Sequence, residues 1–225
     1  MSWTIERRGR VAVVTMTTNP VNAQNRAFFA DLHEAFDRLE RDHVDSPVVL
    51  TGAGRRFSAG LDLGEHFPLF AGDRAGVASW FRDYRLAVDD DAVRFGLNEV
   101  PIGIPMPAVY VRMLAYAWGE PIAARTCLLG ELFTPTRAHA LGLVHELAPA
   151  EDLLDRAVAV AEMTPEDCLG PYAFTKRASQ AAALRDIAEL ADLLDHELPD
   201  GMTSDQARNA HRRYWQQLKG SPPPW

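Results

Sequence analysis

The sequence predicts an α/β fold with a parallel sheet, followed by a helical C-terminal region. Three observations predict it. A β-branched apolar run over Val11–Met16 is typical of a strand, an amphipathic pattern over residues 25–42 is typical of a helix, and residues 47–51 have the composition of a buried strand. A strand, a helix and a strand in this order favour a parallel pair joined by a right-handed crossover.

The predicted helix over residues 25–42 carries apolar side chains at helical spacing, and Asn25 is its candidate N-cap. Gly52-Ala53-Gly54 then breaks the second strand. After this break, residues 57–60 lead into a second helix that begins near Leu61. The sequence therefore places a loop directly at the entrance of a helix.

The rest of the chain has mostly helical patterns, with a single further strand predicted over residues 142–147. Pro199 and Gly201 interrupt the patterns before the last helix. We therefore predict an α/β core over residues 1–147 and a C-terminal helical region over residues 148–225. The predicted helices of the second half cover residues 121–129, 136–141, 150–163, 170–184, 186–194 and 204–218.

Composition excludes several classes of protein. The chain has 225 residues, 47% of them hydrophobic and 24% charged, which is typical of a soluble globular domain. The formal net charge of -8 argues against a nucleic-acid partner and against an anionic membrane surface. No apolar run is long enough to cross a membrane, and the N-terminus lacks a signal-peptide core. We expect a cytoplasmic protein.

The two cysteines and seven histidines suggest no metal site. Cys127 and Cys168 lie in apolar helical patterns without the spacing of metal ligands, so we expect both to be buried free thiols in a reducing compartment. The histidines show no metal-binding spacing either. The sequence predicts a protein without a metal.

The segment Phe57-Ser58-Ala59-Gly60-Leu61-Asp62-Leu63 is the most informative one. Small residues at a helix entrance expose backbone N–H groups, which bind anions well. Facing a thioester carbonyl, such N–H groups would stabilise an enolate. The alternative is that Ala59 and Gly60 only permit tight packing at a turn. Spacing alone leaves both interpretations open.

The same segment resembles the first oxyanion-hole motif of the enoyl-CoA hydratase/isomerase (crotonase) family. Residues 19–23 are similar to the family loop whose backbone meets coenzyme A, and residues 92–103 resemble its Phe-Gly-x-x-Glu segment. Further similar stretches extend the resemblance over nearly the whole chain. The resemblance implies a crotonase-like (ClpP/crotonase) spiral of β-β-α units with a C-terminal helical region.

The resemblance also implies roles for individual residues. The backbone N–H of Ala59 would hold the thioester oxygen, and Glu99 would be the acid/base group, its pKa raised by an apolar pocket. Without the family, Glu99 would be interpreted as a solvated loop residue. No cofactor is implied, because the substrate itself carries coenzyme A. The residues expected to flank the coenzyme are Val21, Asn22, Ala23, Ser58, Gly60 and Leu61.

One part of the family pattern is absent. Between Trp80 and Ala92 the family has a strand, a glycine-rich turn with a second oxyanion N–H, and a helix that carries a second glutamate in hydratases. Here residues 78–82 run almost directly into residues 83–88, an apparent internal deletion near residues 80–84. A true deletion removes one of two oxyanion donors and a central strand. If an unobserved stretch is merely omitted, the enzyme is intact.

The reaction expected from the resemblance is double-bond isomerisation of an enoyl-CoA. Isomerisation needs one base, and Gly96-Leu97-Asn98-Glu99 is more similar to the 3-enoyl-CoA isomerase branch than to hydratases, which usually have a proline before the glutamate. A hydratase and a non-catalytic acyl-CoA-binding protein remain alternatives. The resemblance implies an acyl-CoA substrate and a homotrimer or hexamer. An RNA-binding role fits poorly, since no basic stripe with interleaved aromatics is present.

Overall fold

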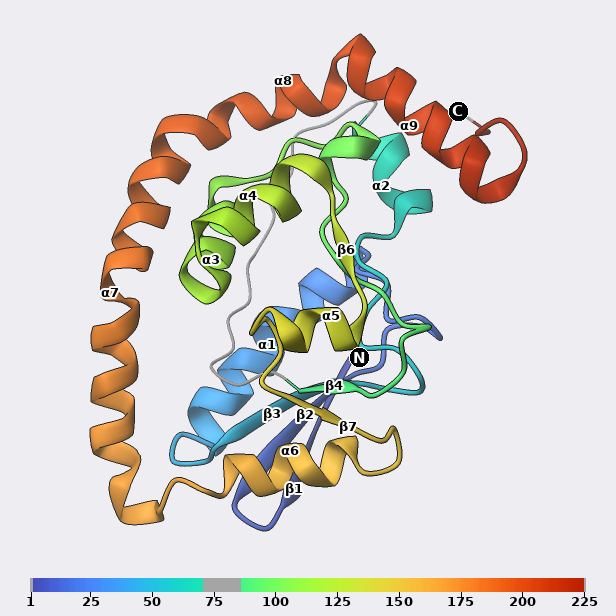
Figure 1. Ribbon diagram of the computed structural model, residues 1–225. Coiled ribbons are helices and arrows are strands. Elements are labelled where there is room, and N and C mark those ends of the chain that lie inside the picture. The colour runs from blue at the N-terminus through green and yellow to red at the C-terminus, as the bar shows by residue number, and fades with distance from the viewer. Residues whose placement is uncertain (1, 71–85, 225) are drawn as a thin grey trace. The chain divides into compact units, whose positions relative to one another are not determined.

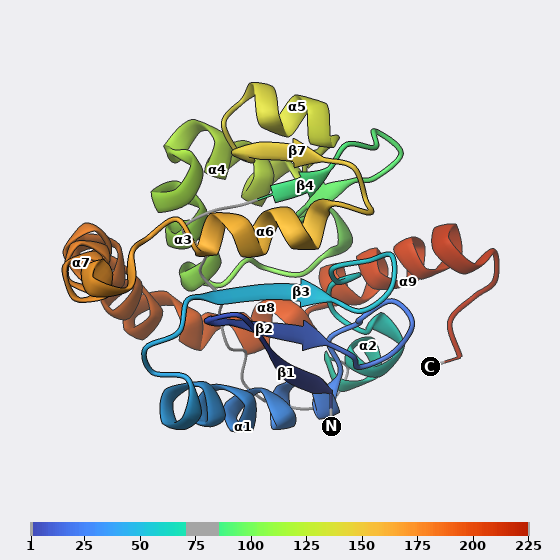
Figure 2. The ribbon, with the colours of Figure 1, turned by 90° about the horizontal axis from the view of Figure 1, so that it is seen from below.

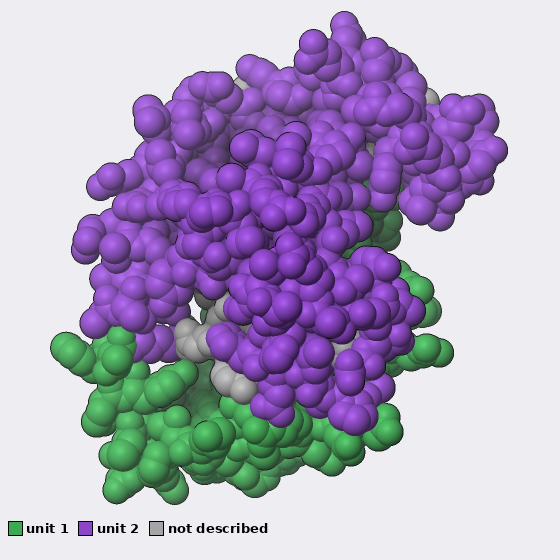
Figure 3. Space-filling view, viewed as in Figure 1, with its two compact units in different colours: residues 1–66, 151–175 green, residues 67–150, 176–225 purple. Residues whose placement is uncertain are grey.

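The computed structural model describes residues 2–70 and 86–224. The chain forms two compact units, which Figure 3 shows in different colours. Unit 1 consists of residues 1–66 and 151–175, and unit 2 of residues 67–150 and 176–225. Each unit thus contains residues from both sides of position 147, and the proposed division at that position stays a prediction.

Unit 1 is built on a three-stranded sheet with the order β1-β2-β3. Strand β2 (Val11–Met16) pairs antiparallel with β1 (Trp3–Arg8) and parallel with β3 (Val48–Gly52). The parallel pair confirms the predicted strand, helix and strand order. Strand β1 was not predicted, because its apolar residues are few and lie between charged and polar ones.

Two helices cover this sheet, one on each face (Figure 2). Successive side chains of a strand point to opposite faces. On one face, Val11, Val13 and Val49 pack against α6 (Leu153–Ala161). On the other, α1 (Arg26–Asp42) approaches through the rings of Trp3 and Phe28, whose centroids are 4.8 Å apart. The predicted cap of α1 is confirmed, since the Phe28 N–H donates to Asn25 Oδ1 at 2.9 Å. Helix α2 (Leu63–Phe70) is present as predicted, but it begins two residues after the predicted start near Leu61.

Unit 2 contains two short strand pairs and a set of helices. Strands β4 and β7 pair in parallel, and β5 and β6 pair antiparallel. The core cluster is formed by Phe133, Ala138, Leu143 and Val144. The strand predicted over residues 142–147 was mostly wrong, since only Glu146 and Leu147 of it belong to β7 (Glu146–Ala148), and Leu143 and Val144 lie in the turn before it. The bounds are β4 (Leu86–Val88), β5 (Phe95–Gly96), η1 (Val100–Ile102), α3 (Ala108–Trp118), α4 (Glu120–Leu129), β6 (Leu132–Phe133), α5 (Pro135–Ala140) and β7 (Glu146–Ala148).

The C-terminal part of the chain is helical, as predicted, but its longest helix is not divided. The prediction of separate helices over residues 170–184 and 186–194 was wrong. After η2 (Glu166–Cys168), α7 (Leu169–Leu194) runs as one continuous helix (Figure 1). The junction residue Arg185 favours helix, and no glycine or proline lies beside it. The chain then continues through η3 (Asp195–Glu197), α8 (Leu198–Thr203) and α9 (Asp205–Lys219).

The cysteines differ from each other in burial. Cys127 on α4 is buried, as expected, whereas Cys168 is exposed, which corrects the expectation that both thiols are buried. Cys168 ends η2, just before α7, and neither of these helices has a buried residue. Within the part of the chain that the structure describes, no cluster of His, Cys, Asp or Glu could hold a metal ion. No described helix combines the length and apolar character needed to cross a membrane.

We expect the native protein to react with a thiol reagent such as DTNB at Cys168 only. Burial raises the pKa of Cys127 to about 11, so its thiol is both shielded and protonated near pH 8. Counting released thionitrobenzoate at about pH 8 should give one fast thiol in buffer and two in guanidinium chloride. The Cys168→Ser variant should lose the fast reaction. Two fast thiols in the native protein would contradict the burial of Cys127.

Gly52 and Gly54 form a matched pair for testing the turn after β3. A Cβ at Gly52 would lie 2.3 Å from the Arg56 carbonyl oxygen and 2.4 Å from that of Phe57, whereas one at Gly54 meets no atom within 4 Å. Gly52→Ala should therefore lower the free energy of unfolding by at least about 2 kcal/mol. Gly54→Ala should cost only about 1 kcal/mol, because of its positive φ. Urea unfolding measures both, and equal losses would contradict the close packing at Gly52.

Candidate active site

Two loops of unit 1 that are far apart in sequence lie side by side. Residues 19–24 and 58–62 form a short parallel bridge centred on Gln24 and Leu61. The Gln24 N–H donates to the Gly60 carbonyl at 2.8 Å, and the Asp62 N–H donates to the Gln24 carbonyl at 3.0 Å. The structure therefore brings together the two segments that carry most of the predicted site residues.

The amides of residues 59 to 62 are not equally available to a ligand. The Ala59 N–H donates to the Val21 carbonyl at 2.9 Å, the Gly60 N–H donates to Ser58 Oγ at 3.1 Å, and the Asp62 amide is used in the bridge. The Leu61 N–H has no acceptor among the residues that the structure describes. It follows Gly60, which has a φ of 80° and open space where a Cβ would lie.

The predicted donor role of Ala59 stays a prediction, although its amide is not free in this conformation. The Ala59 N–H already donates to the Val21 carbonyl, and breaking that hydrogen bond would separate the two paired loops. Leu61, which the resemblance placed beside coenzyme A, supplies the available amide instead. The motif in the sequence marks the segment, but the neighbouring loop decides which of its N–H groups is consumed.

Two of the residues expected to flank coenzyme A are inside unit 1. Asn22 is 0% exposed and Ala23 is 7% exposed, so neither can contact a ligand in this conformation. The Asn22 N–H donates to the Asn19 carbonyl at 2.9 Å, and the Ala23 N–H donates to Asn19 Oδ1 at 3.1 Å. In this conformation both residues have a structural role, and their contact with coenzyme A stays a prediction. Val21, Ser58, Gly60 and Leu61 remain half-buried and thus partly accessible.

Glu99 lies in unit 2, immediately before η1. Its carbonyl oxygen accepts the N–H groups of Ile102 at 3.0 Å and Ile104 at 2.9 Å, which anchors its backbone. The side chain is half-buried, and its Oε2 is fully buried without a hydrogen-bond partner among the described residues. Burial raises the pKa of the Glu99 carboxyl, because desolvation disfavours the charged form. This is the environment of an acid/base group rather than of a solvated loop residue.

The charge of Glu99 acts on two neutral groups, the phenol of Tyr110 and the thiol of Cys127. Burial, reinforced by the charge of Glu99, raises the pKa of Tyr110 on α3 to about 12 and that of Cys127 on α4 to about 11. At neutral pH the phenol and the thiol are therefore protonated. No lysine or arginine in residues 2–70 or 86–224 forms an ion pair with Glu99. Its carboxylate is thus not stabilised by a cation, which leaves it basic.

Helices α4 and α9 hold the turn that carries Glu99. A Cβ at Gly130, at the end of α4, would lie 2.6 Å from Pro101 Cγ, and one at Gly103 would lie 2.7 Å from Cβ of Ala210 on α9. Tyr214 on α9 also accepts a hydrogen bond from Asn98 Nδ2 at 3.5 Å. Sequence reasoning missed the contribution of α9, and its only signal was the amphipathic pattern of the helix.

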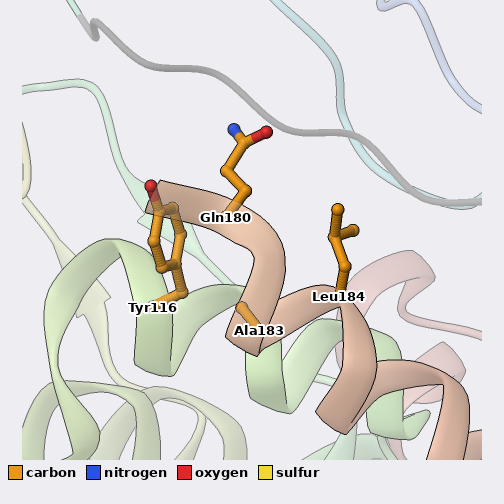
Figure 4. Close-up of a pocket in the computed structure, with 4 residues that line it drawn as sticks. All are labelled: Tyr116, Gln180, Ala183 and Leu184. Carbon is orange, nitrogen blue, oxygen red and sulfur yellow. The ribbon is translucent and has the colours of Figure 1, made fainter. Parts of the chain in front are cut away.

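Leu61 belongs to unit 1 and Glu99 to unit 2. A shallow depression in unit 2 is unrelated to both of them. It is lined by Tyr116, Gln180, Ala183 and Leu184 (Figure 4). None of these is a predicted site residue, and the depression holds no group suited to the expected chemistry.

Comparison with known proteins agrees with the predicted family and fold. The family model described as "Enoyl-CoA hydratase/isomerase" matches residues 6–77 and 75–219, two stretches that overlap at residues 75–77. A protein of Thermus thermophilus named as a candidate enoyl-CoA hydratase is 32% identical over 206 residues, covering 75% of this chain and 80% of that protein. The 206 aligned positions outnumber the residues of this chain that they cover, so the alignment contains gaps in this chain.

Other relatives carry isomerase names. The mitochondrial enoyl-CoA delta isomerase 1 of Rattus norvegicus is 28% identical, covering 69% of this chain and 66% of that protein. The crystal structure of human mitochondrial delta3-delta2-enoyl-CoA isomerase has a TM-score of 0.82 at 24% identity, covering 98% of this chain and 99% of that chain. This likeness confirms the predicted crotonase-like fold. The family match over most of the sequence shows that the chain belongs to the enoyl-CoA hydratase/isomerase family.

Proposed function

We propose that this protein moves the double bond of an enoyl-CoA by proton transfer, with Glu99 as its acid/base group. The observation that carries the proposal is the carboxyl of Glu99, which is half-buried, has a raised pKa and presents a buried oxygen without a partner among the described residues. A carboxylate that has lost hydration and gained no cation has an increased affinity for a proton.

In the proposed reaction, the Glu99 carboxylate removes a proton from C2 of a 3-enoyl thioester. The electron pair left on C2 spreads over the thioester carbonyl and the neighbouring double bond, giving a dienolate. The Leu61 N–H donates to the thioester oxygen as negative charge develops there. The protonated Glu99 then returns the proton to C4, which leaves the double bond between C2 and C3.

Isomerisation is favoured over hydration because it needs a single carboxyl group. Hydration uses a second carboxylate to position water, and the family position of that residue falls where this sequence has no counterpart. Asn98 precedes Glu99 here, whereas hydratases usually have a proline at that position. Hydration remains the alternative reaction of the same site. No cofactor beyond the coenzyme A of the substrate enters either proposal.

A non-catalytic acyl-CoA-binding protein is the second candidate, and a specific observation favours it. The family model matches in two stretches that meet at residues 75–77, next to the apparent deletion near residues 80–84. That position lies outside the described residues. Intact-mass measurement decides whether the segment exists. A mass of 24.9 kDa supports a true deletion, and a larger mass supports a complete enzyme.

The proposal includes assembly into a homotrimer or hexamer. Exposed apolar side chains on α4, namely Leu128 and Leu129, support a subunit contact, because large apolar groups seldom stay uncovered in clusters. Light scattering coupled to size-exclusion chromatography tests this part of the proposal independently of activity.

Replacing Glu99 by glutamine should abolish most turnover. We expect Glu99→Gln to lower kcat for 3-hexenoyl-CoA by at least about 100-fold, because the amide cannot accept the proton. Conversion to the conjugated 2-enoyl product is followed by ultraviolet absorbance. Glu189→Gln, on the exposed surface of α7, is the matched control and should retain wild-type activity. Full activity of Glu99→Gln would refute the role of Glu99, whereas acyl-CoA binding without wild-type turnover would support the second candidate.

The raised pKa of Glu99 predicts a pH dependence of both activity and stability. The base must be ionised, so kcat/KM should rise with pH through that pKa. The raised pKa in the folded state gives stability that is full below the carboxyl's ordinary pKa of 4.5 and is lost as pH rises through the folded-state pKa. Glu99→Gln should therefore be more stable than wild type at about pH 7.5 and equal to it near pH 4. Urea unfolding at both pH values tests this, and a pH-independent difference would contradict it.

A further inference from the structure

The hydroxyl of Ser58 occupies a position between two backbone groups of the paired loops. It donates to the Asn22 carbonyl at 2.7 Å and accepts the Gly60 N–H at 3.1 Å. A hydroxyl has one proton, so donation to Asn22 fixes the lone pair that faces Gly60. Because Ser58 Oγ accepts the Gly60 N–H, this N–H does not compete with the Leu61 N–H for a ligand.

Asn22 holds both sides of this arrangement. Its φ of 48° lies in the left-handed region, which asparagine tolerates better than most residues. Its side-chain Nδ2 donates to the Ala53 carbonyl at 3.1 Å and to the Arg56 carbonyl at 2.8 Å. The buried side chain thereby ties the turn after β3 to the loop that binds Ser58. All of these contacts lie within unit 1.

The combined effect is a selection among neighbouring donors. The Ala59 N–H donates to the Val21 carbonyl, and the Gly60 N–H donates to Ser58 Oγ. The Asp62 N–H donates to the Gln24 carbonyl. Each acceptor is itself fixed by the loop pairing that Asn22 supports. Among residues 59–62, the Leu61 N–H is thus the one without an acceptor in the described part of the chain, and it follows Gly60, which has open space where a Cβ would lie.

We propose that Ser58 and Asn22 are positioning residues, which leave the backbone N–H of Leu61, among those of residues 59–62, available to polarise the thioester. The inference rests on the proposed function for its substrate class, but it concerns the thioester carbonyl rather than the proton transfer. It assigns to Ser58 and Asn22 a role other than contact with coenzyme A.

The Ser58→Ala variant tests the proposal through the carbonyl itself. The probe is crotonyl-CoA labelled with carbon-13 at C1, whose carbonyl stretching band moves to lower frequency when the oxygen accepts a hydrogen bond. We expect bound probe to show this shift in the wild type and to lose most of it in Ser58→Ala. With 3-hexenoyl-CoA, kcat should fall by at least about tenfold while KM changes by less than about threefold.

Two further variants separate positioning from folding. Ser58→Thr keeps the hydroxyl and should restore the band and most of kcat. Ser179→Ala removes an exposed hydroxyl that also donates to a backbone carbonyl, that of Lys176, and should behave as wild type. If Ser58→Ala does not fold, Asn22→Gly retains the positive φ, removes the side-chain amide and should give the same loss of the shift.

The outcomes distinguish this inference from the proposed function. A Ser58→Ala variant with the wild-type band overturns the inference, even if it is less stable or less active. A wild type that binds the probe with a shifted band but does not turn over 3-hexenoyl-CoA refutes the isomerase proposal. In that case, loss of the shift in Ser58→Ala still supports the positioning role.

Discussion

The pairing of residues 19–24 with residues 58–62 is the constraint on which the chemistry of unit 1 depends. Buried backbone donors and acceptors must be paired, so a short bridge between two loops also decides which groups are left over. Two left-handed residues, Asn22 and Gly60, allow the chains to turn into this bridge. Gly52 allows the carbonyls of Arg56 and Phe57 to approach the end of β3. As a result, the N–H groups of Ala59, Gly60 and Asp62 are hydrogen-bonded, whereas that of Leu61 has no acceptor among the described residues.

In unit 2, the proposed functional group is the carboxyl of Glu99, and its environment is set by burial rather than by backbone pairing. Burial raises the pKa of the Glu99 carboxyl, which is the property that its proposed acid/base role needs. A buried polar atom without a partner is typically destabilising by about 1–3 kcal/mol, which is why such atoms are concentrated at functional sites. The turn that carries Glu99 is held by α4 and α9 through glycine contacts that leave no room for a side chain. Rigid support of this kind maintains an otherwise unfavourable carboxyl.

The two candidate functions share these features and differ in what a second oxyanion donor contributes. A missing donor typically lowers kcat by about 100-fold or more, so a chain with the Leu61 amide alone would be a slow enzyme or a binder. The proposed proton transfer by Glu99 and the proposed polarisation of the thioester by Leu61 can therefore be tested separately.

Local patterns in the sequence were sufficient for much of the fold. The β-branched run over Val11–Met16, the amphipathic helix capped by Asn25 and the ordered family motifs depend on residues close together in the chain, and the structure agrees with them. The motifs also pointed to Glu99 and to the segment containing Leu61. These features follow from side-chain periodicity and residue type, which a sequence displays directly.

Tertiary structure alone decided how the site is built. The pairing of the two loops engages the Ala59 amide in a hydrogen bond and buries Asn22 and Ala23. Packing within unit 2 places α9 against the turn that carries Glu99. Tertiary structure also exposes Cys168. Each of these outcomes depends on hydrogen bonds or packing between segments distant in the chain, so no local pattern encodes it. The sequence by itself determined the family and the carboxyl group, and the long-range pairing of backbone groups determined which amide stands free.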